Sequence, residues 1–302
     1  MGIFTKDLEE SNKPAPVPVI EEAPVAPVQP DIEVDGLYEV EDVDVIQLKD
    51  IHKTFKDTGF QIFNGFNLSI KDFKDKHQRI SWVGQSGCGK SILLKLISQL
   101  EFPDSGEVLV YGKPAKEMPH IQMVFQQYSA FPWQKVWEVT SMPLKLRGVK
   151  KAERKKRAYE VLKLVGLEGQ EEKWAQYPIL SGGQLQRVCL SRALCDAENS
   201  KIILLDEVTS ALDVKSKRDI EDAILNVCYN SDLDPTIINV THDISEAVYL
   251  SNRIYVLAAN PCRVHKIIDV SFDTPRRTQD IRNTARFAEY VSEVEAALNE
   301  IM

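Results

Sequence analysis

A glycine-rich loop holds the first residues whose types and spacing suit a chemical task. Residues 84–91 read Gly-Gln-Ser-Gly-Cys-Gly-Lys-Ser, which fits the pattern G-x-x-x-x-G-K-[ST]. Glycines let consecutive backbone N–H groups turn inward toward phosphate oxygens, and a helix that starts here adds the positive end of its dipole. Lys90 would bind the β- and γ-phosphates of a nucleotide, and the Ser91 hydroxyl would be a ligand of Mg²⁺. The alternative is a glycine-rich turn that binds nothing.

A pair of carboxylates follows a second apolar segment. Asp206 and Glu207 come directly after Ile202–Leu205, a continuous apolar run typical of a strand that is buried on both faces. Charge at the end of such a strand is costly unless it is needed there. Asp206 is predicted to hold Mg²⁺, directly or through water, and Glu207 to orient and deprotonate the attacking water. A solvated strand end is the plainer interpretation of a lone acidic pair, and the phosphate loop argues against it.

The elements that must position these residues alternate between strands and helices. A helix is expected from Ser91 to Leu100, and residues 135–197 have a mainly helical pattern. This alternation predicts an α/β fold with a largely parallel sheet. The expected strands are Val45–Ile51, Phe66–Ile70, Arg79–Val83, Gly106–Tyr111, Gln122–Phe125, Ile202–Leu205, Thr236–Val240 and Arg253–Leu257.

The composition excludes several classes of protein. The 302 residues contain 37 Lys and Arg against 45 Asp and Glu, and residues 1–44 alone hold 12 acids and 2 lysines. The rest of the chain is nearly neutral, which argues against a nucleic-acid partner, since that class needs a basic face. No apolar run approaches the roughly 18 residues of a membrane-spanning helix. The five cysteines are odd in number and include no C-x-x-C pair, so we expect reduced thiols rather than a disulfide scaffold or a zinc site.

Three parts are expected along the chain. Residues 1–44 are acidic and proline-rich and should form a disordered tail, either a tether or a dispensable extension. The catalytic domain should span residues 45–272. Residues 273–302 should form a helical extension that packs on its own domain, with pairing to a partner helix as the alternative. Its apolar stripe consists of Phe287, Val291, Val294, Leu298 and Ile301.

A third motif points to a family. The segment 180–184, Leu-Ser-Gly-Gly-Gln, resembles the signature sequence of ABC-type ATPases. Other motifs of that family follow in the same order and cover about residues 45–270. They are Phe55, which resembles the aromatic that stacks on adenine, Gln126 in the Q-loop, Ser210–Asp213 in the D-loop, and His242 as the switch histidine. For Phe55, a place in the core is the ordinary alternative.

The resemblance implies a P-loop NTPase core with a mainly parallel sheet, an antiparallel β subdomain and a helical subdomain inserted at about residues 130–197. It also implies an ATPase that uses ATP and Mg²⁺. Gln126, with Ser91 and Asp206, would contact the metal, while Lys90, Gln126, Glu207 and His242 would carry the chemistry. The implied ATP-binding residues are Phe55, Gly84, Gln85, Ser86, Gly87, Cys88, Gly89, Lys90, Ser91 and Ile92.

The same resemblance implies partners. Two subunits would sandwich two ATP molecules head to tail, the second subunit being another copy or a paralogue. The residues that would act on the opposite subunit's ATP are Ser181, Gly182, Gly183, Gln184 and Asp213. The chain would lie on the cytoplasmic side of the cell (inner) membrane, bound to separate transmembrane permease subunits. A periplasmic or extracellular solute-binding protein would complete an importer.

The chain resembles one branch of the family more than others. The segments 131–133, Phe-Pro-Trp, and 241–250 resemble the group that imports nitrate, sulfonate, taurine and bicarbonate, and only 60 residues follow His242. Trp133 would lie near the permease or in the core. Ile92 stands where the family usually has Thr, and Val208 where it has Pro. The alternatives are an ABC ATPase of another transporter branch and a soluble or regulatory ABC protein without a transport role.

Overall fold

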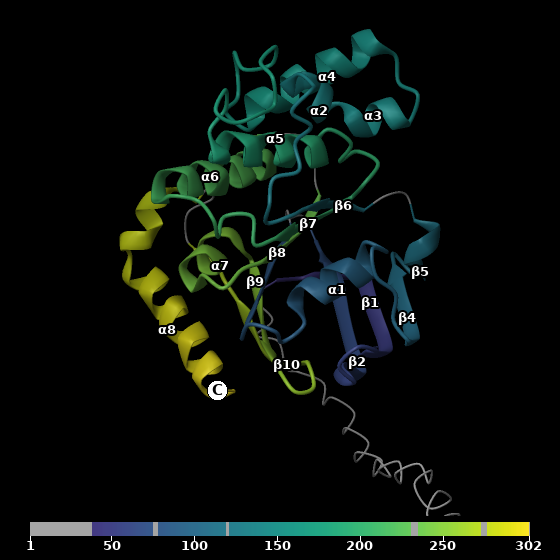
Figure 1. The fold of residues 1–302 in the computed structure, drawn as a ribbon. Helices are drawn as coiled ribbons and strands as arrows, with labels where there is room; N and C mark the ends of the chain where they lie inside the picture. The colour runs from purple at the N-terminus through teal and green to yellow at the C-terminus, as the bar shows by residue number, and fades with distance from the viewer. Residues whose placement is uncertain (1–37, 75–77, 119–120, 231–234, 273–276, 302) are drawn as a thin grey trace, which may run out of the picture.

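The computed structural model describes residues 38–74, 78–118, 121–230, 235–272 and 277–301. Two sheets form the lower part of the molecule, and a group of helices lies above them (Figure 1). Most of the expected acidic tail, residues 1–37, lies outside the described residues. Among the described residues, no helix is both long enough and apolar enough to cross a membrane.

The larger sheet has six strands and carries the phosphate loop. Its order is β10-β9-β3-β8-β7-β6, and every neighbouring pair is parallel except β9 with β10. The predicted α/β architecture is thereby confirmed, whereas the hairpin partner β10 was not expected from the sequence. The strands are β3 (Arg79–Gly84), β6 (Gln122–Val124), β7 (Ile202–Asp206), β8 (Thr236–Val240), β9 (Arg253–Ala258) and β10 (Arg263–Asp269).

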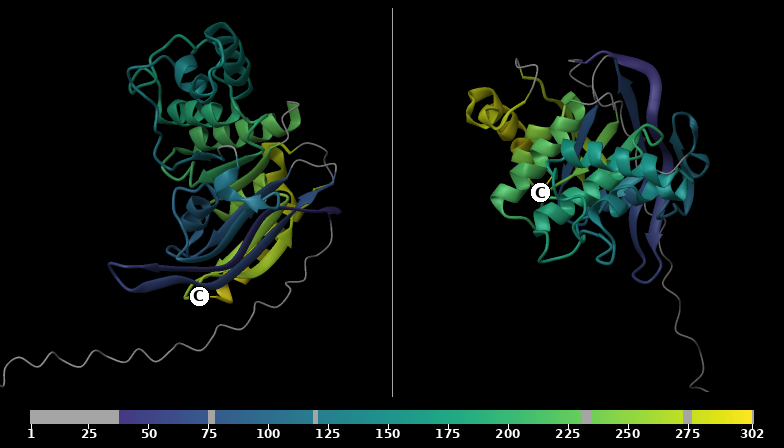
Figure 2. Two further views of the ribbon diagram at one scale, coloured as in Figure 1. Left: turned by 90° about the vertical axis from the view of Figure 1, so that its right-hand side faces the viewer. Right: turned by 90° about the horizontal axis from the view of Figure 1, so that it is seen from above.

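The smaller sheet is antiparallel, in the order β2-β1-β4-β5. Its strands are β1 (Val40–Phe55), β2 (Phe60–Phe73), β4 (Ser105–Val110) and β5 (Lys113–Pro114). Figure 2 shows β1 and β2 as a long curved hairpin on the side of the molecule away from the upper helices.

The first strand starts earlier than residue 45, which corrects the boundary expected for the tail. Val40 pairs with Phe73 across the β1–β2 hairpin. Tyr38 stacks on Phe73 with ring centroids 4.8 Å apart, and its hydroxyl donates a hydrogen bond to the carbonyl oxygen of Val270. Cross-strand pairing and this aromatic contact therefore order an acidic segment whose composition alone suggests a tail.

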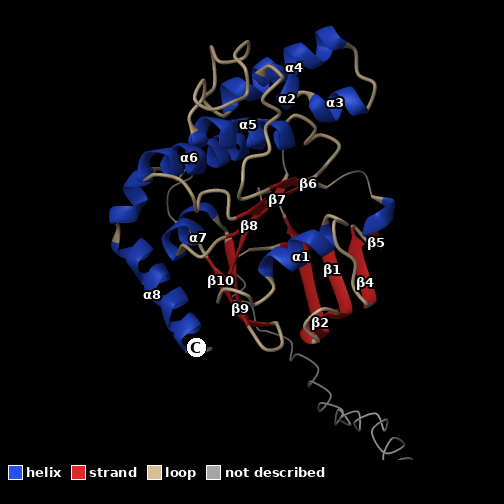
Figure 3. Ribbon diagram, viewed as in Figure 1, coloured by secondary structure: helices blue, strands red, loops and turns tan. Residues whose placement is uncertain are grey.

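The helices fall into two groups (Figure 3). The helical part expected at about residues 130–197 contains α2 (Val136–Thr140), α3 (Met142–Leu146), α4 (Lys151–Leu164) and α5 (Gly182–Leu194). The others lie closer to the sheets: α1 (Lys90–Ile97), α6 (Val214–Asn230), α7 (Ile244–Leu250) and α8 (Ala285–Asn299), with short 3₁₀ helices η1 (Ala115–Glu117) and η2 (Gln279–Asn283).

Two apolar cores cover the two faces of the parallel sheet. Because strand side chains alternate between faces, the continuous apolar run of β7 is divided between the cores. Ile202 and Leu204 join the core shared with α1 and the antiparallel sheet, while Ile203 and Leu205 join the core shared with the helical part. The predicted strand buried on both faces is thereby confirmed.

The C-terminal helix α8 packs on its own domain, as expected. Phe287 and Val294 are buried, and the remaining apolar side chains of the stripe pack against the same core. The Thr284 hydroxyl caps the helix by accepting a hydrogen bond from the backbone N–H of Phe287 at 3.3 Å. All five cysteines are free and buried, which agrees with the expectation of reduced thiols.

Candidate active site

The phosphate loop connects the end of β3 to the start of α1, and two of its glycines are fixed by close neighbours. A Cβ atom on Gly84 would lie 2.4 Å from the carbonyl oxygen of Leu257 on β9. Gly89 has φ +110, and a Cβ atom there would lie 3.0 Å from the ring of Phe63. These contacts require glycine at both positions. The loop therefore holds its curved shape through close contacts with the backbone of β9 and the ring of Phe63 on β2.

Two phosphate-loop side chains, Lys90 and Ser91, are held by hydrogen bonds within the protein. The Lys90 ammonium is buried and donates hydrogen bonds to the carbonyl oxygens of Gly84 and Gln85 at 2.8 and 2.9 Å. The Ser91 hydroxyl donates to Asp206 Oδ1 at 2.7 Å. Burial raises the pKa of Asp206, the neighbouring Glu207 charge raises it further, and the Ser91 hydrogen bond opposes both effects.

The donor atoms of Ser91 and Asp206 suit a magnesium ion. A hydroxyl and a carboxylate are hard oxygen ligands, and Mg²⁺ commonly takes one or two protein carboxylates together with phosphates and water. Within the described ranges, no cluster of three or more His, Cys, Asp or Glu could hold a metal by itself. A site of this kind would therefore be completed by a bound nucleotide.

The predicted base and the switch histidine lie side by side. β7 and β8 are parallel neighbours with Asp206 opposite Val240, so the residues after both strands meet at one edge. His242 Nδ1 lies 3.4 Å from Glu207 Oε2, and the His242 side chain is 63% exposed. Glu207 adopts φ +48, and its backbone N–H donates to Val240 O at 2.9 Å. A left-handed backbone conformation costs a non-glycine residue about 1–3 kcal/mol, and residues that keep it are concentrated at active sites.

Gln126 reaches the same edge by another route. Its side-chain Nε2 donates to the Ser210 hydroxyl at 3.0 Å, and that hydroxyl donates to the carbonyl oxygen of Glu207 at 2.9 Å. Gln186 on α5 donates to the carbonyl oxygen of Phe125 at 2.8 Å, so the Q-loop is bonded to the helical part. The structure thus brings Gln126 to the Glu207 loop rather than into hydrogen-bond contact with Ser91 or Asp206.

The signature residues form a separate group. Ser181 caps α5: its hydroxyl accepts from the N–H of Gln184 at 3.2 Å, and Gln184 Oε1 accepts from the N–H of Ser181 at 2.9 Å. A Cβ atom on Gly183 would lie 2.6 Å from Ser216 on α6. Asp213 caps α6, and the hydrogen bond from Ser216 Oγ is the main reason that its pKa is lowered. In the described part of the chain, no hydrogen bond or ion pair joins this group to residues 84–91.

The remaining predicted residues occupy varied surroundings. Phe55 is half-buried opposite Phe60 at the β1–β2 turn and packs against the core. Cys88 is buried beside Lys90, with Sγ 3.7 Å from Nζ. Ser86, Gly87 and Gly182 lie at the surface or partly exposed, Ile92 packs against the core, and Val208 is buried. Trp133 is 69% exposed, which is not compatible with the core alternative.

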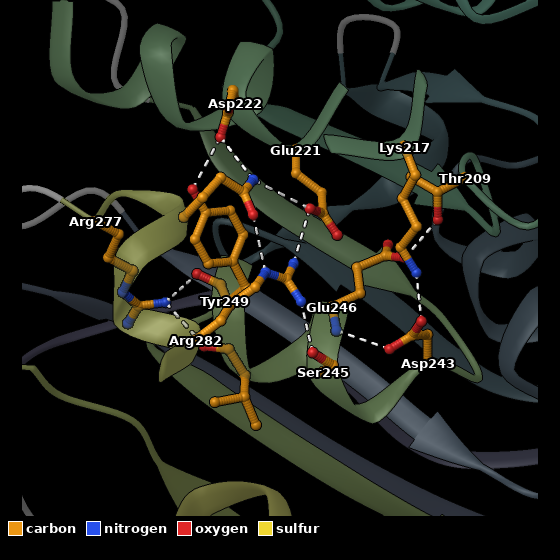
Figure 4. Close-up of polar contacts among 12 residues, drawn as sticks. Thr209, Lys217, Glu221, Asp222, Asp243, Ser245, Glu246, Tyr249, Arg277 and Arg282 are labelled. Atoms are coloured by element: carbon orange, nitrogen blue, oxygen red, sulfur yellow. Dashed lines mark hydrogen bonds and ion pairs between the residues drawn. The ribbon is translucent and has the colours of Figure 1, made fainter. Parts of the chain in front are cut away.

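Sequence reasoning missed a buried charge cluster, which consists of Lys217, Glu221, Asp243, Glu246 and Arg282 (Figure 4). Glu246 is fully buried and accepts hydrogen bonds from Thr209 and from Asn239, the latter at 3.0 Å. Lys217 Nζ lies 3.1 Å from Glu246 and also pairs with Asp243. The available signal was Glu246, the one charged residue of the mainly apolar helix α7, four residues after His242.

Comparisons with known proteins agree with these motifs. A model of the ABC transporter family matches residues 64–210. The aliphatic sulfonates import ATP-binding protein SsuB of Bacillus cereus is 35% identical over 238 residues, which are 76% of this chain and 88% of that protein. The bicarbonate transport ATP-binding protein CmpC of Synechococcus elongatus is 35% identical over 262 residues, or 84% of this chain and 38% of that protein.

A solved structure has the same fold. It is a dimeric post-hydrolysis state of the ATP-binding cassette MJ0796 bound to ADP and Pi, with 29% sequence identity and a TM-score of 0.62. The match covers 75% of this chain and 99% of the cassette. Together with the phosphate loop, the Glu207–His242 pair and the signature at the start of α5, these likenesses identify the chain as an ATP-binding, ATP-hydrolysing member of the ABC transporter family.

Proposed function

We propose that the chain is the ATPase subunit of an importer for a small anion such as a sulfonate, taurine, nitrate or bicarbonate. The observation that carries this proposal is the extent of the likeness. Sulfonate and bicarbonate import proteins align with 76% and 84% of this chain, well beyond the family core at residues 64–210. Specificity for the solute would reside in separate permease and solute-binding proteins, so the chain itself would supply the energy.

The site residues have distinct roles in this proposal. Lys90 and the loop N–H groups bind the ATP phosphates and neutralise their charge. Ser91 and Asp206 would hold Mg²⁺, which would supply positive charge to the phosphates of a bound nucleotide. Glu207 orients and deprotonates the attacking water, and His242, 3.4 Å away, steadies that water and the γ-phosphate. Gln126, which is bonded through Ser210 to the Glu207 loop, couples binding of the γ-phosphate and metal to the position of the helical part.

The second half of each site would come from a partner subunit. Ser181 and the first N–H groups of α5 form a helix N-terminus suited to a phosphate, yet they belong to a group separate from this chain's own phosphate loop. The related cassette bound to ADP and Pi is a dimer. We infer that Ser181, Gly182, Gly183, Gln184 and Asp213 complete the ATP site of the opposite subunit, either a second copy or a paralogue.

Exposed aromatic side chains supply a surface for the permease. Trp133 and Tyr128 are 69% and 46% exposed beside the Q-loop, and the Phe131 ring centroid lies 5.6 Å from that of Trp133. Exposed clustered aromatic groups are typical of protein interfaces. Binding there would place the chain against the cytoplasmic side of the membrane and connect Gln126 to the permease.

The direct test is reconstitution with the permease in liposomes. The co-purified complex would be supplied inside with ATP and outside with its solute-binding protein and isotopically labelled taurine, nitrate or bicarbonate. ATP-dependent uptake of one of these anions, lost in Trp133→Ala, is the expected result. Uptake of a cation or a sugar instead would assign another importer branch. A chain that hydrolyses ATP but joins no membrane protein would contradict the transport role.

A further inference from the structure

The residues beyond the family core contact the helix that follows the switch histidine. Helix α7 starts directly after His242 and Asp243, and its last carbonyl groups face the extension. Arg277 is buried and donates to the carbonyl oxygens of Val248 and Tyr249 at 3.3 and 2.8 Å. The extension therefore fixes α7 at the end opposite to the active site.

Arg282 in η2 joins the extension to the other end of α7. Its guanidinium donates to Glu221 Oε2 at 2.8 Å and to the Ser245 hydroxyl at 2.5 Å. The same group lies 4.5 Å from the ring centroid of Tyr249. Figure 4 shows it between α6 and α7, close to the middle of the buried charge cluster.

The three carboxylates of this cluster share two cations, so removal of Arg282 would leave all three with Lys217 alone. Glu221 and Glu246 are fully buried, and Asp243 is half-buried, whereas only Lys217 and Arg282 supply positive charge within the cluster. Glu221 Oε1 accepts no hydrogen bond from any described residue. Without Arg282, Glu221 would be a buried carboxylate that keeps a hydrogen bond from Gln279 at 3.4 Å and the attraction of the Lys217 charge.

Lys217 connects the excess of negative charge in the cluster to the residues proposed to hydrolyse ATP. Its ammonium pairs with Asp243, which is adjacent to His242, and with Glu246, which binds Thr209 two residues after Glu207. If Lys217 moved toward Glu221, it would release both contacts. The cap that Asp243 provides to α7, by accepting from the N–H of Glu246 at 2.9 Å, would also lose its support.

We propose that Arg282 is a positioning residue for ATP hydrolysis: by holding Glu221 it keeps Lys217 on Asp243 and Glu246, and thereby keeps His242 and Glu207 in their relative positions. This inference rests on the proposed roles of those two residues. It assigns a part in the reaction to η2, which lies outside the residues matched by the family model.

The experiment compares steady-state ATPase kinetics of the full chain with those of Arg282→Gln, Arg282→Lys and Arg286→Ala. Arg286 is the matched control: it is an exposed arginine at the start of α8, paired with Glu289 at 3.0 Å. We expect Arg282→Gln to lower kcat about tenfold with the KM for ATP changed less than twofold, since misplaced groups cost up to about 100-fold. Arg282→Lys should recover part of kcat, and Arg286→Ala should match the wild type.

The pH profile gives a second readout. Burial raises the pKa of Glu221, and the charge of Glu246 raises it further, whereas Arg282 and Lys217 lower it. Asp222 and Tyr249 lie beside Glu221 in the same part of the structure. Loss of Arg282 should therefore raise the pKa of Glu221 further. Because a neutral Glu221 no longer attracts Lys217, the deficit in kcat of Arg282→Gln relative to the wild type should shrink as the pH falls. Glu221→Gln combined with Arg282→Gln removes both charges, so kcat should rise above that of Arg282→Gln alone.

Equal kinetics for Arg282→Gln and Arg286→Ala would overturn the proposal. So would a loss of activity that follows only the folded fraction, with no change in the pH profile and no recovery in the double variant. These results differ from a failure of the proposed function, in which the wild-type chain itself would not hydrolyse ATP or Glu207→Gln would turn over normally.

Discussion

The two strand ends that flank the ATP site are held by different forces. At the end of β3, uncharged groups shape the phosphate loop: Gly84 lies against the backbone of Leu257 on β9, and Gly89 lies against the ring of Phe63. At the ends of β7 and β8, the buried charge cluster includes Asp243, which follows His242 in the chain, and bonds to Thr209, two residues after Glu207. Close packing therefore holds the end of β3, which we call the neutral edge. Ion pairs hold the ends of β7 and β8, which we call the charged edge.

This difference suits the two tasks. The phosphate loop must present fixed N–H groups to an anion, and backbone dipoles need no change of protonation to do so. The Glu207 edge must respond to the γ-phosphate, and charged groups that share a cation can change partners. We therefore expect charge-removing substitutions to change turnover or stability at the ends of β7 and β8, and changes of side-chain size to change stability and ATP binding at the phosphate loop.

The largest expected effect is on turnover at the charged edge. Glu207→Gln removes the proposed base without changing its size, so we expect kcat to fall by about 10²–10⁴-fold. ATP binding should persist, because Lys90 and the loop N–H groups remain in place. Single-turnover hydrolysis and equilibrium binding of a fluorescent ATP analogue measure the two quantities. Near-normal turnover would remove Glu207 from the mechanism.

The next effect is on the stability of the same edge. Glu246→Ala leaves Lys217 and Thr209 without their buried partner, and breaking a buried ion pair costs about 3–5 kcal/mol. Urea denaturation of the purified chain would measure this loss. Glu293→Ala is a matched control, since Glu293 pairs with Lys266 at 2.9 Å on the surface and should change the free energy of unfolding by less than about 1 kcal/mol. Similar losses in both variants would contradict a buried charged edge.

The close contact between the phosphate loop and β9 is tested by adding one methyl group to Gly84. Gly84→Ala places a Cβ atom 2.4 Å from Leu257 O, so we expect a loss of about 1–3 kcal/mol in the free energy of unfolding and weaker ATP binding. In Gly182→Ala the nearest atoms would be 3.9 Å away, which is ordinary contact, so its stability should be unchanged. If both variants denature at the same urea concentration, the close approach of β9 does not shape the loop.

The smallest effect concerns an exposed charge in the helical part. Hydrogen bonds from Lys135, Lys155 and Tyr159 lower the pKa of Glu172 to about 2. Because the folded-state pKa lies below the ordinary value, Glu172 adds stability above about pH 4.5, and that stability is lost as the pH falls toward 2. Glu172→Gln should therefore melt slightly below the wild type at pH 7, with a gap that narrows as the pH falls.

The control for this variant is Glu168→Gln, whose partner Lys163 lies 3.5 Å away on the surface. The difference in melting temperature between Glu168→Gln and the wild type should not change comparably with pH. A gap for Glu172→Gln that widens at low pH would show that the sign is wrong, and high salt should reduce the gap at pH 7 because exposed charges are screened.

The sequence allows prediction of the phosphate loop and the Asp206–Glu207 pair better than of the buried charge cluster. The phosphate loop and the Asp206–Glu207 pair are local patterns, in which residue type, spacing and the adjacent strand together imply the site. In contrast, the residues of the charge cluster come from three separated segments. Lys217 and Glu221 are four apart on α6 and resemble an ordinary surface pair. Only the packing of α7 and η2 against that helix makes them buried.

Parts of the fold escaped prediction for similar reasons. The acidic character of residues 40–44 masks a strand that depends on its partner β2 and on Tyr38. Strand β10 mixes polar and apolar residues, and pairing with β9 is what orders it. Trp133 could be a core or a surface residue by pattern alone, and the structure places it at the surface.

We propose above all that each ATP site joins the phosphate loop and Glu207 of one chain to the signature residues, Ser181–Gln184, of another chain. The most direct measurement mixes Glu207→Gln with Ser181→Arg, each inactive alone, and follows ATP hydrolysis while energy transfer between labels reports mixed dimers. A mixed dimer holds one intact site, so activity should recover to roughly a quarter of the wild-type value at equal amounts. No recovery, although mixed dimers form, would contradict the shared site.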